Sequence, residues 1–260
     1  MISSELAVSV VQDSLSWQDP AANRQRYESH FSSLKGSDLV VLPEMFSTGF
    51  SMNPWEAYET MNGETVQWMR QQAGQLQAVI TGSLTMKLAE DVYVNRMIWA
   101  RPDGEIQYYD KRHLFRYGQE HLHFKNGKEK VVLEHKGWRV ALFVCYDLRF
   151  PVWSRNCDDY DLALYVANWP NSRQFAWDSL LVARAIENQA YVAACNRLGE
   201  DPLGNEFSGG SVILDFMGKP LAHFADELKT ETCSLSMQGL QEFREHFPAS
   251  LDTDKFEILD

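Results

Sequence analysis

Short apolar runs recur along the whole chain, and each is too short to form a helix of ordinary length. Most are rich in Val, Ile, Leu and aromatic residues and are bounded by Gly, Pro, Asn or Asp, which favours β-strands. The runs are Leu6–Val11, Leu39–Leu42, Ala78–Leu84, Tyr93–Ala100, Ile106–Tyr109, Lys130–Leu133, Val140–Val144, Leu162–Ala167, Tyr191–Ala194, Ser211–Phe216 and Thr230–Leu235. Leu39–Leu42 and Leu162–Ala167 are apolar at successive positions, a pattern typical of strands covered on both faces.

Amphipathic stretches between these runs predict helices over residues 22–34, 64–76, 175–190 and 237–247. In the third helix, Phe175 and Ile186 are among the side chains expected to face the core. No repeat, low-complexity segment or linker interrupts the alternation of strands and helices. We therefore expect one α/β domain over residues 1–260, with a C-terminal helix and tail from about residue 237. The acidic end, Asp252–Asp260, is interpreted as a surface arm or a dimer-packing tail.

The cysteines and the apolar stretches bear on the cellular compartment of the protein. The four cysteines include no C-x-x-C pair, and four in a chain of 260 residues do not make a disulfide scaffold. The N-terminus lacks the pattern of a secretory signal, and no apolar stretch approaches the length of a membrane span. His121-x-His123 has no third ligand at a suitable spacing, so no metal is expected. The sequence predicts a cytoplasmic protein.

Three of the apolar segments end on a chemically reactive side chain. Val140–Val144 stops at Cys145, Leu39–Leu42 leads through a proline to Glu44, and residues 104–110 end on Lys111. Each has an ordinary interpretation, because a cysteine often packs as a small hydrophobe, a glutamate caps a helix and a charge run is a solvated turn. Together they supply the three kinds of group that acyl transfer requires.

A thiol attacks a carboxamide readily when a base removes its proton and donors stabilise the oxyanion. We interpret Glu44 as the base, Lys111 as a fixed positive charge for the oxyanion, and the backbone N–H of Tyr146 as the second donor. The scheme passes through a Cys145 thioester and requires no metal or organic cofactor. A Cys–His pair is the alternative, but only His113 adjoins a proposed site residue, and no papain-like or caspase-like pattern surrounds Cys145.

The charge of the chain limits its partners. A formal net charge of −12 argues against nucleic acid or an anionic membrane. Residues 110–139 are instead net positive, because they contain eight Lys and Arg and only four Asp and Glu. A basic segment beside the proposed site suits a small anionic substrate, although a scatter of solvated lysines explains the outer residues equally well.

The chain resembles the nitrilase (carbon–nitrogen hydrolase) superfamily from about residue 5 to residue 236. The matching segments are Leu42–Phe46, Tyr109–Phe115, Val144–Pro151 and Arg184–Gln189. The resemblance implies a four-layer αββα sandwich, usually paired into an αββααββα homodimer, and a catalytic triad of Glu44, Lys111 and Cys145. It also implies that Glu120 positions the substrate and the lysine.

Within the superfamily the chain is most similar to bacterial omega-amidases, above all in Glu44–Phe50. This resemblance implies hydrolysis of the terminal amide of 2-oxoglutaramate or 2-oxosuccinamate, with release of ammonia. Such substrates carry a carboxylate remote from the amide, so a cation is expected to meet it. The candidates for substrate binding are Arg173, with Arg149 and Arg116 as alternatives, and the aromatic residues Trp169 and Phe46 as pocket walls.

Several alternatives stay open. The spacing from Lys111 to Glu120 and the short loop at Asn126–Lys128 favour a small pocket over one for bulky aromatic nitriles. Other activities of the same superfamily are a short aliphatic amidase, a carbamoyl-amine hydrolase or a nitrilase. A catalytically silent small-molecule binding protein is the alternative from a different class, and the presence of all three triad residues counts against it.

Overall fold

Two six-stranded mixed sheets form the centre of the protein, as described by a computed structural model for residues 4–258. The first sheet has the strand order β14-β1-β2-β3-β4-β5, and the second has the order β13-β12-β9-β8-β7-β6. The strands of the first sheet are β1 (Glu5–Gln12), β2 (Leu39–Val41), β3 (Val79–Ala89), β4 (Val92–Ala100), β5 (Ile106–Asp110) and β14 (Lys229–Ser236). Those of the second are β6 (Val132–His135), β7 (Trp138–Val144), β8 (Leu162–Ala167), β9 (Tyr191–Asn196), β12 (Val212–Leu214) and β13 (Pro220–His223).

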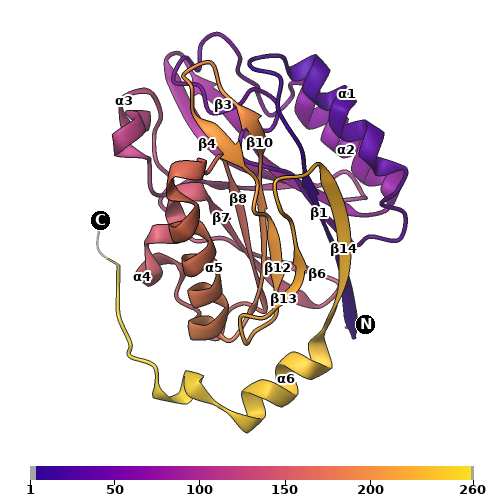
Figure 1. Ribbon diagram of the computed structural model, residues 1–260, viewed down its shortest axis with the longest axis vertical. Helices are drawn as coiled ribbons and strands as arrows, with labels where there is room; N and C mark the ends of the chain where they lie inside the picture. The colour runs from indigo at the N-terminus through magenta and orange to yellow at the C-terminus, as the bar shows by residue number, and fades with distance from the viewer. Residues whose placement is uncertain (1–3, 259–260) are drawn as a thin grey trace.

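Helices cover the outer faces of both sheets. Figure 1 shows α1 and α2 together on one side of the molecule and α5 on the other. The helices are α1 (Pro20–Phe31), α2 (Glu64–Leu76), α3 (Glu120–His123), α4 (Pro151–Ser154), α5 (Gln174–Asn188) and α6 (Met237–His246). Short 3-10 turns are η1 (Arg116–Gly118), η2 (Cys145–Arg149), η3 (Asn171–Arg173) and η4 (Ala249–Asp252), and a small hairpin pairs β10 (Leu198–Glu200) with β11 (Glu206–Ser208). The expected α/β fold, with two sheets flanked by helices, is confirmed.

The successive apolar residues of β2 show why its pattern does not alternate. Leu39 and Val41 pack into the core between the sheets, whereas Val40 and Leu42 pack into the core beneath α1 and α2. All four side chains are fully buried. The same double coverage holds for β8, whose six residues are all buried. Burial on both faces therefore produces the continuous apolar runs in the sequence.

Helix boundaries follow ordinary capping chemistry. Asp19 caps α1 by accepting a hydrogen bond from the Ala22 N–H, and Pro20 occupies the first helical position. On α5 the expected orientation is wrong for two residues, because Phe175 and Ile186 are 85% and 52% exposed. Their burial was inferred from apolar character alone, whereas the buried face of α5 is built on Trp177, Leu181 and Arg184 with their neighbours.

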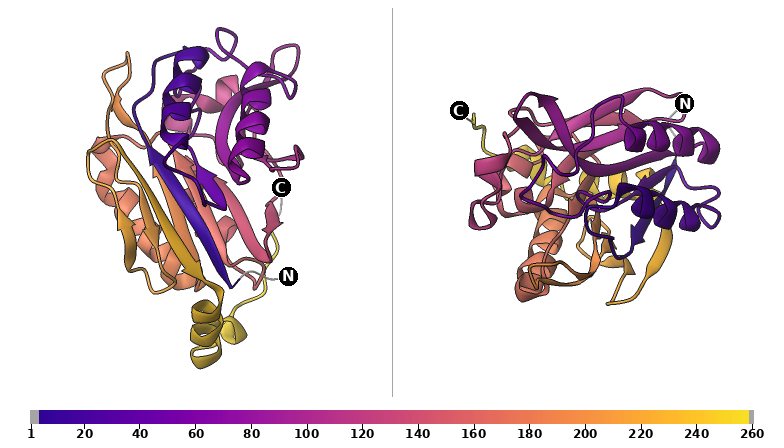
Figure 2. Two further views of the ribbon diagram at one scale, coloured as in Figure 1. Left: turned by 90° about the vertical axis from the view of Figure 1, so that its right-hand side faces the viewer. Right: turned by 90° about the horizontal axis from the view of Figure 1, so that it is seen from above.

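The C-terminal segment lies outside this sandwich. Figure 2 shows α6 standing away from the two sheets, with the tail running on from it. Arg244 connects α6 to the sandwich. It forms an ion pair with Asp161 at 2.9 Å and donates a hydrogen bond to the Gln189 carbonyl. None of the helices between residues 4 and 258 combines the length and the apolar composition needed to cross a bilayer.

Candidate active site

Strands from both sheets end at the same edge of the sandwich, and this edge brings the predicted residues together. Strand β2 is parallel to its neighbours in the first sheet, and β7 and β8 are parallel in the second. Glu44 follows β2, Cys145 follows β7 and Lys111 follows β5 directly. Polar groups just beyond the carboxyl ends of parallel strands converge in this way in α/β proteins.

The Glu44 carboxylate is held by donors from three parts of the chain. Its Oε1 accepts from Lys111 Nζ at 2.8 Å and from Asn95 Nδ2 at 2.7 Å. Its Oε2 accepts from the backbone N–H of Asn168 at 2.8 Å. The Asn168 side chain also donates to the Glu44 carbonyl at 2.6 Å, so the end of β2 is tied to the end of β8 in the other sheet.

Lys111 lies between two carboxylates and is 1% exposed. Its Nζ contacts Glu44 Oε1 at 2.8 Å and the two oxygens of Glu120 at 3.1 and 2.9 Å. Burial by itself lowers the Lys111 pKa, but the charges of Glu120 and Glu44 outweigh burial and raise the pKa above its ordinary value. The ammonium group therefore stays charged near pH 7.

Glu120 closes this buried cluster from the opposite side. Its Oε2 accepts the Phe115 N–H at 2.6 Å, and its Oε1 receives a longer contact of 3.3 Å from Asn95. Burial raises the pKa of Glu120, against the charge of Lys111, which lowers it. The structure thus places Glu120 against both Lys111 and the loop that lines the adjacent cavity.

Cys145 begins the turn η2, and its backbone has a φ of 44°. This left-handed conformation is uncommon for a residue with a side chain and marks a sharp strand-to-helix bend. The Glu44 carboxylate acts on the thiol through its charge. Burial and then the charge of Glu44 raise the thiol pKa well above 9.0, although Lys111 opposes them. The sulfur is therefore a neutral thiol near pH 7, with a carboxylate in place to take its proton.

The Tyr146 N–H follows the thiol directly. It belongs to the first positions of η2, whose N–H groups have no acceptor within the turn. A backbone donor beside the nucleophile and a buried ammonium group on the other side are the two components of an oxyanion site.

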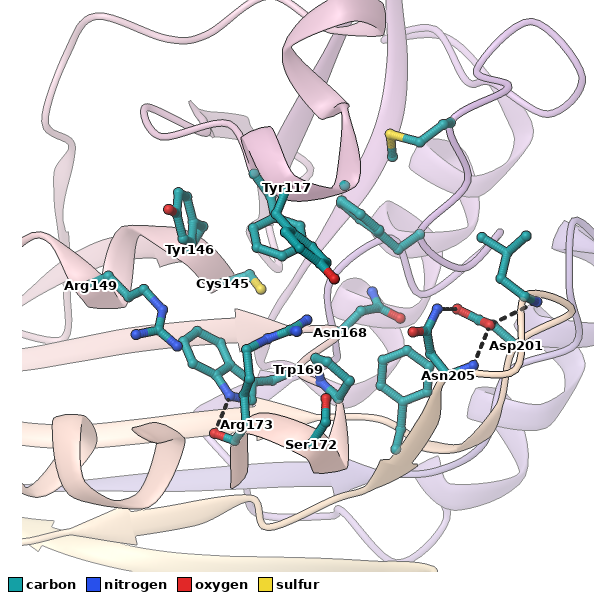
Figure 3. Close-up of a pocket in the computed structure, with 17 residues that line it drawn as sticks. Tyr117, Cys145, Tyr146, Arg149, Asn168, Trp169, Ser172, Arg173, Asp201 and Asn205 are labelled. Atoms are coloured by element: carbon teal, nitrogen blue, oxygen red, sulfur yellow. Dashed lines mark hydrogen bonds between the residues drawn. The ribbon is translucent and has the colours of Figure 1, made fainter. Parts of the chain in front are cut away.

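Cys145 opens on a cavity of about 280 Å³ (Figure 3). Trp169, Arg149 and Arg173 line the same cavity. The Arg149 guanidinium lies over the Trp169 ring at 5.0 Å from its centre, and Arg173 lies over the rings of Phe115 and Tyr117. Neither guanidinium forms an ion pair with a carboxylate in residues 4–258.

The cavity also contains one carboxylate, Asp201, at the start of the β10–β11 turn. Its oxygens accept the N–H groups of Leu203 and Asn205 at 2.9 and 3.0 Å and the Asn205 side-chain amide at 2.8 Å. The Asp201 charge is therefore engaged within its own turn, and the two half-buried arginines give this wall of the cavity a positive character.

Two expectations for substrate binding are wrong. Phe46, in the turn that follows β2, is fully buried and packs against Tyr27 and Trp68 in the core beneath the helices. Arg116, in η1, lines a neighbouring groove and not the Cys145 cavity. The two hollows have Tyr146 as a shared wall.

Asn95 and Asn168 are site residues that the sequence reasoning missed. Asn95 and its neighbour Arg96 interrupt the apolar residues of β4, and Asn168 directly follows β8. A polar residue inside or just beyond a buried strand is the signal that would have identified both. Within residues 4–258, no three His, Cys, Asp or Glu side chains form a group that would hold a metal ion.

Comparison with known proteins agrees with this geometry. The family model for carbon-nitrogen hydrolases matches residues 7–245. The chain is 49% identical over 260 residues to the omega-amidase YafV of Yersinia enterocolitica, covering 98% of this chain and 100% of that protein. It is 35% identical over 254 residues to the 2-oxoglutaramate amidase of Bacillus subtilis, covering 95% and 97%.

The solved structure of a CN-hydrolase superfamily protein from Xanthomonas campestris superposes with a TM-score of 0.95. It is 47% identical in sequence, and the match covers 98% of this chain and 99% of that one. The resemblance inferred from the four motifs is confirmed, and Cys145 stands at the nucleophile position expected from it. The chain belongs to the carbon-nitrogen hydrolase family.

Proposed function

We propose that the protein is an omega-amidase that hydrolyses the terminal amide of small 2-oxo acid amides. 2-Oxoglutaramate and 2-oxosuccinamate are the substrates, and the products are the 2-oxo dicarboxylate and ammonia. The observation that carries this assignment is one small cavity that holds the Cys145 thiol and two guanidinium groups, neither of which pairs with a carboxylate among residues 4–258. Full-length relatives with omega-amidase and 2-oxoglutaramate amidase names support it.

The first half of the reaction acylates Cys145. Glu44 Oε2 takes the thiol proton while the sulfur attacks the amide carbon, because Oε1 already accepts two hydrogen bonds, from Lys111 and Asn95, whereas Oε2 accepts one, from the Asn168 N–H. The oxyanion receives hydrogen bonds from the Tyr146 N–H and from Lys111. Lys111 has all its contacts with carboxylates in the free site, so it exchanges one contact with Glu120 for the oxyanion.

Collapse of the tetrahedral intermediate breaks the carbon–nitrogen bond. Glu44 returns its proton to the departing nitrogen, and ammonia leaves while the acyl group remains on Cys145 as a thioester. Glu44 then takes a proton from water, and the resulting hydroxide attacks the thioester carbon. The sulfur departs and regains the proton from Glu44, and the new carboxylic acid is released. Its proton passes to the ammonia in solution, which gives the dicarboxylate and ammonium. Atoms and charges balance without any further reactant.

Substrate recognition rests on the arginine wall of the cavity. Arg173 is the first candidate for the remote carboxylate, and Arg149 adds a second positive charge on the same side of the cavity. Planar guanidinium groups bind carboxylates through two parallel hydrogen bonds. A cavity of about 280 Å³ suits a five-carbon substrate and agrees with the small pocket expected from the loop lengths.

The decisive test is ammonia release from a panel of substrates. We expect a higher kcat/KM for 2-oxoglutaramate than for a short aliphatic amide, an N-carbamoyl amino acid or an aliphatic nitrile. A preference for one of these competitors would overturn the substrate assignment. Intact-protein mass spectrometry after rapid mixing adds a second criterion, because the enzyme accumulates an acyl adduct on Cys145 and a silent binding protein does not.

We also propose that the protein is a cytoplasmic homodimer. The outer face of α5 carries exposed Phe175, Val182 and Ile186, and Met217 lies exposed near them. An apolar surface of this kind is suited to pairing with a second copy through the same surface. The four cysteines are free thiols, in keeping with a reducing compartment. Light scattering of the purified protein tests the dimer, and Ile186→Glu is expected to dissociate it.

A further inference from the structure

Asp147 lies two residues beyond the nucleophile and is fully buried. It does not line the Cys145 cavity, so it has no direct access to a substrate. Its Oδ2 accepts the Val144 N–H at 2.9 Å and the Tyr109 hydroxyl at 2.8 Å. Its Oδ1 accepts the His113 N–H at 3.0 Å and lies 2.8 Å from Nδ1 of the same histidine.

These partners belong to the two segments that carry the reacting groups. Val144 immediately precedes Cys145, whereas Tyr109 and His113 stand two residues before and two residues after Lys111. The first segment continues β7 of the second sheet, and the other continues β5 of the first. One side chain therefore connects the bend that presents the thiol to the strand end that presents the ammonium group.

We propose that Asp147 is a positioning residue that fixes Cys145 relative to Lys111. This inference rests on the proposed roles of those two residues, and it deepens them. The bend at Cys145 has a left-handed backbone, which persists only where the surroundings hold it. Asp147 stabilises this backbone conformation by accepting the N–H of Val144, the residue just before the bend.

Only a carboxylate satisfies this arrangement. Each oxygen of Asp147 accepts one backbone N–H, from Val144 on one side and from His113 on the other. An asparagine of the same shape has one accepting oxygen and one donating nitrogen. Whichever way its amide turns, one buried backbone N–H faces another donor, and that segment has to move.

Neighbouring groups make the connection rigid. The Tyr109 hydroxyl also accepts the Arg112 N–H and the indole N–H of Trp153, both at 3.1 Å. The His113 ring is stacked on Phe150, with centres 3.7 Å apart and planes 6° from parallel. Tyr109 is fully buried, and the charge of Asp147 contributes to raising its pKa after burial, so the hydroxyl remains a donor.

Asp147→Asn is the main test, with Asp161→Asn as its matched control. Asp161 is also a buried, multiply bonded carboxylate, but it pairs with Arg139 and Arg244 and lies outside the cavity. Both variants are measured well below their Tm, with the folded fraction taken from circular dichroism. We expect Asp147→Asn to lower kcat roughly 10- to 100-fold with a change in KM below about threefold. Asp161→Asn is expected to lower Tm and leave the kcat of the folded protein unchanged.

Iodoacetamide alkylation of Cys145 provides a measurement that does not depend on the amidase assignment. Cys157 is exposed and serves as the internal reference in the same peptide digest. In Asp147→Asn the ratio of the Cys145 rate to the Cys157 rate is expected to change at least threefold, because the thiol shifts relative to Glu44 and Lys111. If the wild type releases no ammonia from the amide panel, this ratio still tests the role of Asp147.

Two outcomes overturn the proposal: a folded Asp147→Asn protein with unchanged kcat and alkylation ratio, or an equal loss of kcat in Asp161→Asn. If Asp147→Asn does not fold, Tyr109→Phe replaces it, because this change removes the hydroxyl contact to Asp147 and leaves the Val144 and His113 N–H groups bonded to the carboxylate. Trp153→Phe is its control, because that change removes the indole donor to the same hydroxyl and leaves all contacts of Asp147 in place. Tyr109→Phe is expected to lower kcat about three- to tenfold at unchanged KM. An unchanged kcat in folded Tyr109→Phe would then overturn the role of Asp147.

Discussion

The two sheets contribute different kinds of side chain to the site. The first sheet provides Glu44, Lys111 and Asn95, which are at most 1% exposed and are bonded to one another. The second sheet provides the half-buried Cys145 and leads into the turns that carry Arg149 and Arg173. These three residues line the cavity, and neither arginine forms an ion pair with a carboxylate in the described chain.

In the proposed mechanism, the buried residues of the first sheet handle the proton transfers, whereas the arginines that follow the second sheet bind the substrate. Charges in a buried cluster interact strongly because little water screens them, so they keep a fixed geometry before substrate arrives. Unpaired guanidinium groups on a cavity wall keep their hydrogen-bond donors available for an incoming anion. The first sheet is therefore expected to control kcat and stability, and the arginines after the second sheet are expected to control KM.

The largest effect on turnover is expected at Cys145, where the buried cluster of the first sheet meets the cavity. Cys145→Ala removes the nucleophile, so turnover should fall by roughly 10⁴-fold or more. The fold should be retained, because the thiol is a minor packing group. Ammonia release and thermal unfolding measure the two properties. Cys157→Ala, at an exposed cysteine, is the control that should behave as wild type. Loss of cooperative unfolding in Cys145→Ala would instead make that cysteine structural.

Removing the cation of the buried cluster should cost stability. Lys111→Met leaves Glu44 and Glu120 facing each other without an intervening charge, and breaking a buried ionic group in this way costs about 3–5 kcal/mol. Arg173→Met removes a half-buried cation without an ion pair and should change stability by less than about 0.5 kcal/mol. Urea unfolding at pH 7 measures both. Equal losses would remove the distinction between the cluster and the cavity wall.

The arginines should show the opposite behaviour in kinetics. Arg173→Ala should raise KM for 2-oxoglutaramate roughly 10- to 100-fold, because losing a charge-assisted hydrogen bond weakens binding by about this factor. A neutral aliphatic amide should be affected far less, because it has no carboxylate to bind. The same pair of substrates with Arg149→Ala shows whether the second arginine shares the contact. An equal rise for charged and neutral amides would exclude Arg173 from the carboxylate site.

The smallest effect concerns the protonation of the nucleophile. The thiolate is the form that reacts with iodoacetamide, and burial with the Glu44 charge raises the Cys145 pKa well above 9.0. The alkylation rate of Cys145 should therefore still be rising with pH at 9.0. Lys111→Met should move the rise to higher pH, because the lysine charge lowers the thiol pKa. A rate that is constant from pH 7 to pH 9 would mean that the free enzyme already holds a thiolate.

Residues at the ends of apolar strands were accessible to sequence reasoning. Glu44, Lys111 and Cys145 each follow such a strand, so the sequence alone predicts that they meet at one sheet edge. Asn95 carries a weaker signal, because a polar residue inside a buried strand indicates that it has a partner but does not say that the partner is the Glu44 carboxylate. Phe46 and Arg116 were misassigned because sequence proximity to a catalytic residue does not fix side-chain direction.

The sequence by itself determined the strands, the covering helices and which residues are proposed as nucleophile, base and cation, because these depend on local composition and on the order of residues. Tertiary structure decided which oxygen of Glu44 is available to the thiol and which arginines reach the cavity. It also decided that Asp147 joins the two catalytic segments. These properties depend on contacts between distant parts of the chain, such as Glu44 with Lys111 and Asp147 with Tyr109, and only the packing of the two sheets sets their distances and directions.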